Sequence, residues 1–189
     1  MITLLELLKD DPAIYVRRSV ANNLNDIGKD HPDILINTAK KWMKGASGER
    51  QALVEHALRW LVKQGHPDAL RLLGFGRVAK VTIEDVVIVP RRVAKGGKVT
   101  VTLGLRSTSR SVQRVIVDMR VHFIKSNGRN SPKVFKLKSV DLAGGGREAF
   151  RKTVTVTDLT TRKHYPGRHV VEALVNGKIL PLGSFTLLK

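Results

Sequence analysis

The sequence predicts a multidomain protein in which α-helices come first and an antiparallel β-sandwich follows. Before Gly74, apolar residues recur every three or four positions, which is the spacing of amphipathic helices. After Gly76, β-branched residues alternate with polar ones, which is the spacing of strands. We therefore expect a helical domain over residues 1–74 and a β domain over residues 77–189.

The helical region is predicted to form helix pairs. A Leu-rich helix is expected over residues 2–9, and Asp11-Pro12 is expected to open a second helix, with Asp11 as its N-cap. A third helix is expected after His31-Pro32-Asp33, a fourth over about 49–63, and a short fifth after His66-Pro67-Asp68. The two His-Pro-Asp tripeptides lie 35 residues apart, near the period of helical repeat proteins. This pattern predicts an incomplete array of HEAT-like helical repeats.

The first helix carries more apolar residues than one face can hold. Arrays of helical repeats usually need about three units and polar caps at their ends. We therefore expect either missing N-terminal repeats or another chain to cover this helix. Its apolar residues are Ile2, Leu4, Leu5, Leu7 and Leu8.

The second region contains candidate strands separated by turns rich in Gly, Asn and Pro. Short strands in this number and order predict an Ig-like or fibronectin-like antiparallel β-sandwich, with a β-barrel as the alternative. The strands are expected at about 78–89, 98–106, 112–125, 133–141, 147–157, 168–176 and 179–188.

Positive charge is concentrated in this second region. The chain has 34 Lys and Arg against 16 Asp and Glu, a formal net charge of +18. Residues 1–76 carry +2 of it and residues 77–189 carry +16. A positive potential of this strength favours a polyanionic partner, and nucleic acid is the favoured one. The alternatives are association with a ribosome, binding to an acidic membrane, and charge that serves only solubility. No Cys is present, which excludes disulfides and thiolate metal sites.

The predicted second helix contains a polar segment that stability alone explains poorly, because Asn and Asp are mediocre helix formers. Helical spacing places Arg18 and Asn22 on one face with Asn25 or Asp26. The structural alternatives to a functional role are packing for Arg17, hydrogen bonds between repeats for the Asn residues, and a salt bridge for Asp26. The candidate site residues are Arg17, Arg18, Ser19, Asn22, Asn23, Asn25 and Asp26.

Cationic residues also gather in the first, third and fifth loops of the predicted sandwich. Alternate loops of such a fold lie at the same end, so one pole is expected to be densely cationic and to contact phosphates. The alternative is that these cations only form a solvated surface. The opposite pole is a second candidate for phosphate contacts, because it holds Arg106, Arg110 and Arg147. The loops hold Arg91, Arg92, Lys95, Lys98, Lys125, Arg129, Lys133, Arg162, Lys163, His164 and Arg168.

Two segments resemble a known family. Residues 15–33, YVRRSVANNLNDIGKDHPD, and residues 161–177, TRKHYPGRHVVEALVNG, are similar to the AlkC/AlkD-like DNA alkylation-repair proteins with an Ig-like C-terminal domain. The resemblance implies a HEAT-repeat DNA N-glycosylase that releases alkylated purines from double-stranded DNA in the cytoplasm, at the nucleoid. It also implies Asp26 as the catalytic carboxylate, phosphate contacts by the Arg and Asn side chains, and no cofactor or metal.

The alternatives to this enzyme are a non-enzymatic DNA- or RNA-binding module and a protein-interaction scaffold. The net charge of residues 77–189 argues against the scaffold, and a carboxylate on a phosphate-binding face argues against a simple binding module. Neither a signal peptide nor a membrane span is expected from the sequence.

Overall fold

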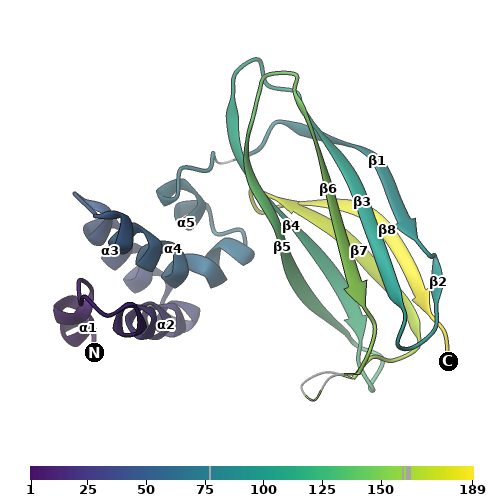
Figure 1. The fold of residues 1–189 in the computed structure, drawn as a ribbon, viewed down its shortest axis with the longest axis horizontal. Helices are drawn as coiled ribbons and strands as arrows, with labels where there is room; N and C mark the ends of the chain where they lie inside the picture. Colours follow the sequence, from purple (N-terminus) through teal and green to yellow (C-terminus); the bar gives the residue numbers. More distant parts are fainter. Residues whose placement is uncertain (77, 159, 161–162) are drawn as a thin grey trace. The chain divides into compact units, whose positions relative to one another are not determined.

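The computed structural model describes residues 1–76, 78–158, 160 and 163–189. The described residues form five helices followed by eight strands, as Figure 1 shows. They divide into two compact units, Met1–Gly74 and Phe75–Lys189. We call them the helical unit and the sandwich.

In the helical unit, α2 packs against both α3 and α4, and α3 packs against α4. Leu24, Leu35 and Leu58 are fully buried at these contacts, one from each of the three helices. The assignment of the helices to HEAT-like repeats stays a prediction. The helices are α1 (Ile2–Leu8), α2 (Ile14–Asp30), α3 (Pro32–Met43), α4 (Gly48–Lys63) and α5 (Pro67–Leu72).

The start of α2 differs from the sequence expectation. Asp11 was expected to cap the helix, but the N-cap is Ala13 and the helix begins at Ile14. The Asp11 carboxylate Oδ1 instead accepts a hydrogen bond at 2.8 Å from the backbone N–H of Ala13. Asp favours this local turn two residues ahead, which competes with a helical conformation.

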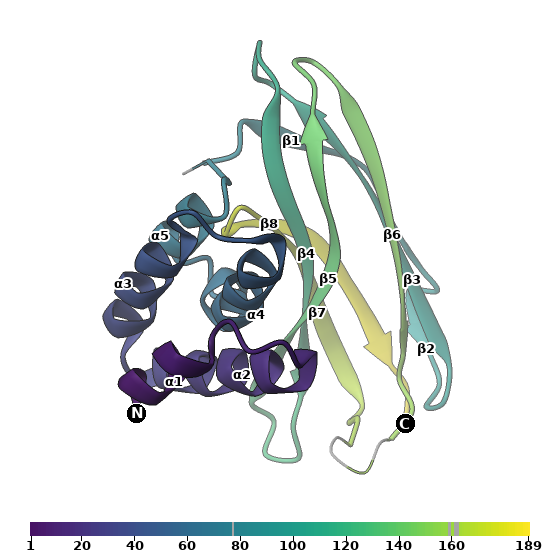
Figure 2. The same cartoon turned by 60° about the vertical axis from the view of Figure 1, so that its left-hand side comes forward.

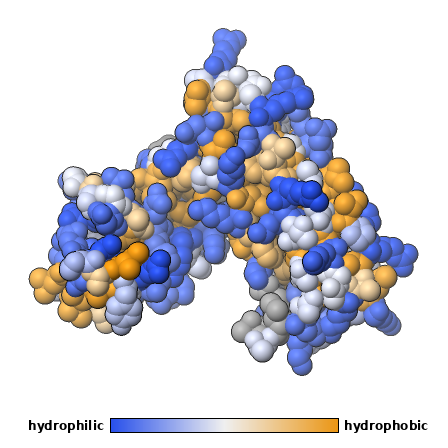
Figure 3. Space-filling model, viewed as in Figure 1, coloured by the Kyte–Doolittle hydropathy of each residue, from blue (hydrophilic) through white to orange (hydrophobic). Residues whose placement is uncertain are grey.

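The surface around α1 is partly apolar. Leu5 is buried, whereas Leu4 and Leu7 are 53% and 77% exposed. Figure 3 shows hydrophobic atoms at the lower left, where Figure 1 places α1. The indole N–H of Trp42 donates a 2.6 Å hydrogen bond to the Glu6 carboxylate and ties α1 to α3. One face of α1 is therefore used within the unit and the other lies open.

The sandwich has a three-stranded sheet in the order β1-β3-β6 and a five-stranded sheet in the order β2-β8-β7-β4-β5. Side chains of both sheets form one buried core that includes Leu103, Met119 and Phe185. Neighbouring strands are antiparallel except for β2 and β8. The strands are β1 (Val81–Val89), β2 (Arg92–Val93), β3 (Lys98–Ser107), β4 (Gln113–Ile124), β5 (Asn130–Leu142), β6 (Arg147–Thr155), β7 (Gly167–Val175) and β8 (Lys178–Leu187).

The seven expected strands correspond to the seven longer strands. The two-residue β2 was not expected, because a segment this short has no periodicity to detect. Two separate sheets also exclude the closed barrel that the sequence left open as an alternative.

The turn between β7 and β8 is fixed by Asn176, which has a positive φ of 46°. Its side-chain oxygen accepts a 2.9 Å hydrogen bond from the N–H of Ile116 in β4. Its side-chain nitrogen donates to the carbonyls of Gly76 and Arg114, each at 3.3 Å. Asn tolerates the left-handed conformation, so one buried side chain both shapes the turn and joins three segments.

Candidate nucleic-acid interface

A polar face runs across α2 and α4 of the helical unit. Arg18, Asn22 and Asp26 lie four residues apart on α2, so they share one side of that helix. The His56 Nε2–H of α4 donates a 3.0 Å hydrogen bond to the Asn22 side-chain oxygen, which connects the two helices. The α2–α4 face consists of Arg18, Asn22, Asp26, His56 and Arg59.

Asp26 presents an ionised carboxylate to solvent. Its side chain is 64% exposed, and the Lys29 ammonium lies 2.7 Å from its Oδ1. The hydrogen bond and the charge of Lys29 lower the pKa of Asp26, and a hydrogen bond from Asn25 contributes further. The carboxylate is therefore anionic at neutral pH. The sequence left a salt bridge of Asp26 as the alternative to a functional role. That salt bridge is present, and its partner is Lys29 rather than Arg18.

His56 and Arg59 are site residues that sequence reasoning missed. Partial burial lowers the pKa of His56, and the positive charges of Arg59 and Arg18 lower it further. His56 is therefore neutral near pH 7 and acts as a hydrogen-bond donor to Asn22. The available signal was the spacing of three between His56 and Arg59 on the exposed side of the predicted fourth helix.

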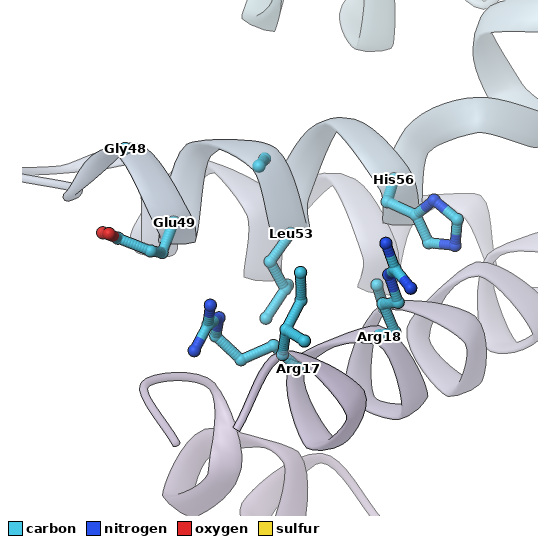
Figure 4. Close-up of a pocket in the computed structure, with 9 residues that line it drawn as sticks. Arg17, Arg18, Gly48, Glu49, Leu53 and His56 are labelled. Atoms are coloured by element: carbon cyan, nitrogen blue, oxygen red, sulfur yellow. The ribbon is translucent and has the colours of Figure 1, made fainter. Parts of the chain in front are cut away.

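A hollow of about 430 Å³ opens between the first halves of α2 and α4. Figure 4 shows Arg18 beside His56 at one end, and Arg17 and Glu49 toward the other. Its floor is apolar, with Leu53 among the lining residues, and its rim is mainly cationic. The cationic rim can therefore bind an anionic group that lies against the apolar floor of the hollow.

Several expected site residues make contacts within the helical unit instead. The Arg17 guanidinium donates hydrogen bonds to the carbonyls of Asp11 and Pro12, at 2.6 and 2.8 Å. Asn25 is buried, and its side-chain oxygen accepts a 3.2 Å hydrogen bond from the N–H of Trp60. These contacts match the packing alternatives. Ser19 and Asn23 are exposed, and the Asn23 amide donates to the carbonyl of Ser19.

In the sandwich, the three cation-bearing loops lie at one pole, as Figure 1 shows. Direct contacts join two of them, because the Gly96 N–H donates to the Val156 carbonyl and Lys95 pairs with Asp158 at 2.6 Å. Arg162 lies outside the described residues. The basic pole consists of exposed Arg91, Arg92, Lys95, Lys125, Arg129, Lys163 and Arg168.

The cations of the basic pole are held to different degrees. Arg168 donates a 3.0 Å hydrogen bond to the Ser184 hydroxyl, and Arg91 donates to the Ser184 carbonyl at 3.3 Å. Lys125 and Lys163 border a second hollow of about 470 Å³, which Tyr165 also lines. The pole therefore offers both oriented guanidinium groups and exposed ammonium groups to a ligand.

His164, expected in the cationic loops, is a core residue, because only 4% of it is exposed. It packs edge-on against Phe123 with ring centres 4.8 Å apart. His169 stacks on Phe185 at 5.1 Å and is fully buried. Burial lowers the pKa of His169, so this ring is neutral. These four rings pack together beneath the basic pole.

The described part of the chain contains no group of three His, Asp or Glu side chains arranged to hold a metal ion. None of its helices is both long enough and apolar enough to span a membrane.

Comparison with known proteins decides the family. Residues 82–189 match the family described as "Uncharacterised protein YhaZ, C-terminal Ig-like domain". The chain belongs to this family. It is also 33% identical to the protein YhaZ of Bacillus subtilis over 179 residues, covering 95% of the chain and 49% of YhaZ. The sandwich is thus an Ig-like domain, as the strand pattern predicted.

A solved structure extends the likeness of this YhaZ-family chain over its whole length. The alkylpurine DNA glycosylase AlkC of Pseudomonas fluorescens, bound to DNA containing an abasic site analog, matches with a TM-score of 0.95 and 40% identity. The match covers 100% of the chain and 52% of AlkC, so the chain spans about half the length of these relatives. The AlkC-like resemblance expected from the two sequence segments is confirmed.

A β-glucosidase of Listeria innocua in complex with gluconolactone matches 61% of the chain and 17% of the enzyme, at a TM-score of 0.50. Its 13% identity shows a shared fold alone.

Proposed function

We propose that this chain acts in DNA alkylation repair, by binding damaged double-stranded DNA and hydrolysing the N-glycosidic bond of alkylated purines. The observation that carries the proposal is the match of the whole chain to DNA-bound AlkC at 40% identity. The match includes both the helical unit with Asp26 and the sandwich with the basic pole.

The chemistry suits a single carboxylate. An alkylated purine is already cationic, so it leaves as a neutral base without being protonated by the protein. The sugar becomes positively charged in the transition state, and a nearby carboxylate stabilises that charge or orients the attacking water. Asp26 meets the electrostatic requirement, because Lys29 lowers its pKa and keeps it ionised.

The exposure of Asp26 sets a condition on this mechanism. A charge in water stabilises a cation weakly, and its effect grows when water is excluded. Asp26 is largely exposed in the free protein, so bound DNA has to cover it. Arg18 and Asn22 share the side of α2 that carries Asp26, and the charge of Arg59 acts on Asp26, so these side chains are suited to hold the flanking phosphates. We leave Asn25 and Arg17 out of this set because their contacts lie within the helical unit.

Release of methylpurine from methylated duplex DNA tests the proposal. We expect the Asp26→Asn variant to release base about 100-fold more slowly than wild type, the scale of losing one transition-state electrostatic contact. Asp30→Asn is the matched control, since it removes an exposed carboxylate of the same helix. Equal release by wild type and Asp26→Asn would contradict the catalytic role.

A non-enzymatic DNA-binding module is the second candidate, and the open position of Asp26 favours it. The hollow of the helical unit that Figure 4 draws is lined by Arg17, Arg18 and His56 but not by Asp26. Under this alternative the chain binds duplex DNA in a salt-sensitive manner and releases no base. Asp26→Asn then preserves or strengthens binding, because it removes a charge that repels phosphate.

A further inference from the structure

The hollow beside Tyr165 is a recess within the basic pole. It has a volume of about 470 Å³ and lies between the turn after β4 and the segment before β7. β4 and β7 are antiparallel neighbours, so β4 ends where β7 begins, and Figure 2 shows both at the same end of the sandwich. We call it the pole hollow. Its polar lining residues are Lys125, Ser126, Ser131, Thr160, Lys163 and Tyr165.

Hydrogen bonds fix the walls of the pole hollow. The backbone N–H of Lys125 donates to the carbonyl of Arg129 at 2.8 Å, which closes the turn between β4 and β5. The buried His169 links the two walls. Its Nδ1 accepts a hydrogen bond at 3.4 Å from the N–H of Ile124, and its Nε2–H donates to the Tyr165 carbonyl at 3.2 Å. The two walls are therefore tied together without a ligand.

The polar side chains of the pole hollow have no partners within the protein. Among the described residues, the ammonium groups of Lys125 and Lys163 form no ion pair. The hydroxyls of Ser126, Ser131 and Tyr165 form no hydrogen bond to any described residue either. Cations and hydroxyls therefore line one recess with their hydrogen-bonding capacity available to a ligand.

The segment between β6 and β7 contains one acidic residue, Asp158, and this carboxylate is engaged elsewhere. Its Oδ2 pairs with Lys95 at 2.6 Å, and its Oδ1 accepts a 2.8 Å hydrogen bond from the N–H of His164. None of the described residues that line the pole hollow is acidic. Ammonium groups only donate hydrogen bonds, so the hollow favours an anion with several acceptor oxygens. A phosphoryl group meets this requirement.

Binding of water alone is the structural alternative, because exposed lysines and hydroxyls in loops are normally solvated. Water accounts for the lysines but not for a braced recess whose volume lies in the range of about 300–1,000 Å³ typical of small-molecule sites. Tyr165 is half-buried and adds an aromatic ring, on which a nucleobase can stack. Phosphate-binding cations beside an aromatic ring match the two parts of a nucleotide.

The charge of the pole hollow distinguishes between two kinds of phosphate. A phosphate monoester carries a charge of about −1.5 to −2 at pH 7, which is close to the two positive charges of Lys125 and Lys163. An internal phosphate of a DNA strand carries a single negative charge. Internal phosphates also lie along a convex duplex, which the exposed cations around the hollow can contact. The hollow therefore fits a monoester better than an internal phosphate.

We propose that the pole hollow binds the phosphate monoester of a nucleotide, either at the end of a DNA strand or as a free mononucleotide. The proposal rests on the proposed function only in taking a nucleotide as the ligand. Lys125 and Lys163 bind the phosphoryl oxygens. Ser126 and Ser131 donate further hydrogen bonds to them, and the ring of Tyr165 contacts the base.

Binding of the full chain to undamaged blunt duplexes tests the strand end. One duplex carries phosphates at all its strand ends and the other carries hydroxyls. Wild type is expected to bind the phosphorylated duplex about 5- to 10-fold more tightly, the scale of two exposed ion pairs. The hollow variant, Lys125→Gln with Lys163→Gln, is expected to lose this preference.

The matched control is Lys80→Gln with Lys178→Gln, which removes the same charge from exposed sandwich positions outside the pole hollow. It is expected to keep the preference for phosphorylated ends. An equal loss of the preference in both double variants would show that bulk charge governs the effect and would overturn the proposal.

Chemical acetylation of the wild-type protein tests the free nucleotide without any substitution. Deoxyadenosine monophosphate is expected to protect Lys125 and Lys163, while Lys178 stays reactive. Deoxyadenosine without its phosphate is expected to protect neither lysine. Equal protection by inorganic phosphate would reduce the pole hollow to a general anion site and overturn the assignment to a nucleotide.

The two measurements together identify the source of the ligand. A preference for phosphorylated ends without protection by the free nucleotide assigns the pole hollow to strand ends, and the reverse assigns it to free mononucleotides. Absence of both effects overturns the proposal, even if the protein releases methylpurine. Either effect without any release of methylpurine would leave the hollow in place and remove the proposed enzymatic function.

Discussion

The helical unit and the sandwich differ in the balance of their charges. In the region 1–76, 11 Lys and Arg face 9 Asp and Glu, so the charges nearly balance, and pairs such as Arg50–Asp10, Lys29–Asp26 and Arg71–Asp68 form. In the region 77–189, 23 Lys and Arg face 7 Asp and Glu, so most cations have no acidic partner to bind. From this difference we expect the proposed DNA affinity to depend mainly on the sandwich, whereas the helical unit positions a few specific groups.

The largest expected effect tests this division directly. Replacing Lys125, Arg129 and Lys163 by Gln removes three cations of the basic pole. We expect affinity for duplex DNA to fall about 100-fold near 150 mM salt, because each phosphate contact releases counterions. Fluorescence anisotropy over a salt series measures the change.

The matched control lies in the helical unit. Lys40→Gln, Lys41→Gln and Lys63→Gln removes the same charge from exposed positions of α3 and α4. Affinity is expected to change less than about 5-fold, because the α2–α4 face and the sandwich remain intact. An equal loss in both triple variants would show that net charge, rather than its location, governs binding.

The next effect concerns the packing that holds α2. A Cβ added at Gly28 would lie 2.2 Å from the Leu35 side chain in α3. Gly28→Ala is therefore expected to destabilise the helical unit by about 1–3 kcal/mol through overpacking. Gly48→Ala is the control, since nothing lies within 4 Å of its added Cβ. Both tryptophans are in the helical unit, so their fluorescence in denaturant reports on this unit alone.

A similar experiment separates the two kinds of Asn on α2. Asn25→Ala leaves the N–H of Trp60 without its side-chain acceptor, and we expect a loss of about 1–2 kcal/mol. Asn23→Ala changes an exposed residue and is expected to stay within about 0.5 kcal/mol. Identical unfolding midpoints for the two variants would contradict the structural role assigned to Asn25.

The smallest expected effect is on the acid sensitivity of the sandwich. Burial lowers the pKa of His169 in the folded state, so the unfolded chain binds a proton more readily. Stability is then complete above the ordinary His pKa of 6.5 and declines as the pH falls below it. Circular dichroism melts between pH 7.5 and 5 are expected to decline less for His169→Gln than for the exposed-site control His31→Gln.

Periodicity predicted the elements of the fold better than the contacts of the site. The strands were detectable because one face of each is buried, whereas the start of α2 depends on a side-chain turn at Asp11. Helical spacing correctly grouped Arg18, Asn22 and Asp26. It did not separate exposed Asn22 from buried Asn25, because the partner of Asn25 is 35 residues away on α4.

His56 was missed for the same reason, since its contact with Asn22 spans 34 residues. In the sandwich, loop order predicted the basic pole, but it did not reveal that His164 turns inward to Phe123. The register between neighbouring strands could not be predicted either, because the sequence pattern alone does not define it.

The hydrogen bonds of Asn176 also bear on chemical ageing. Asn followed by Gly is prone to deamidation, which needs a mobile backbone and converts the amide to a carboxylate. Asn176 precedes Gly177 but is held by three hydrogen bonds, whereas Asn127 precedes Gly128 in an exposed loop at the basic pole. Stored protein is therefore expected to acquire its first new negative charge at Asn127, among the cations proposed to contact DNA. If the proposed DNA contacts are made, the affinity for DNA would fall with storage while the fold stays intact.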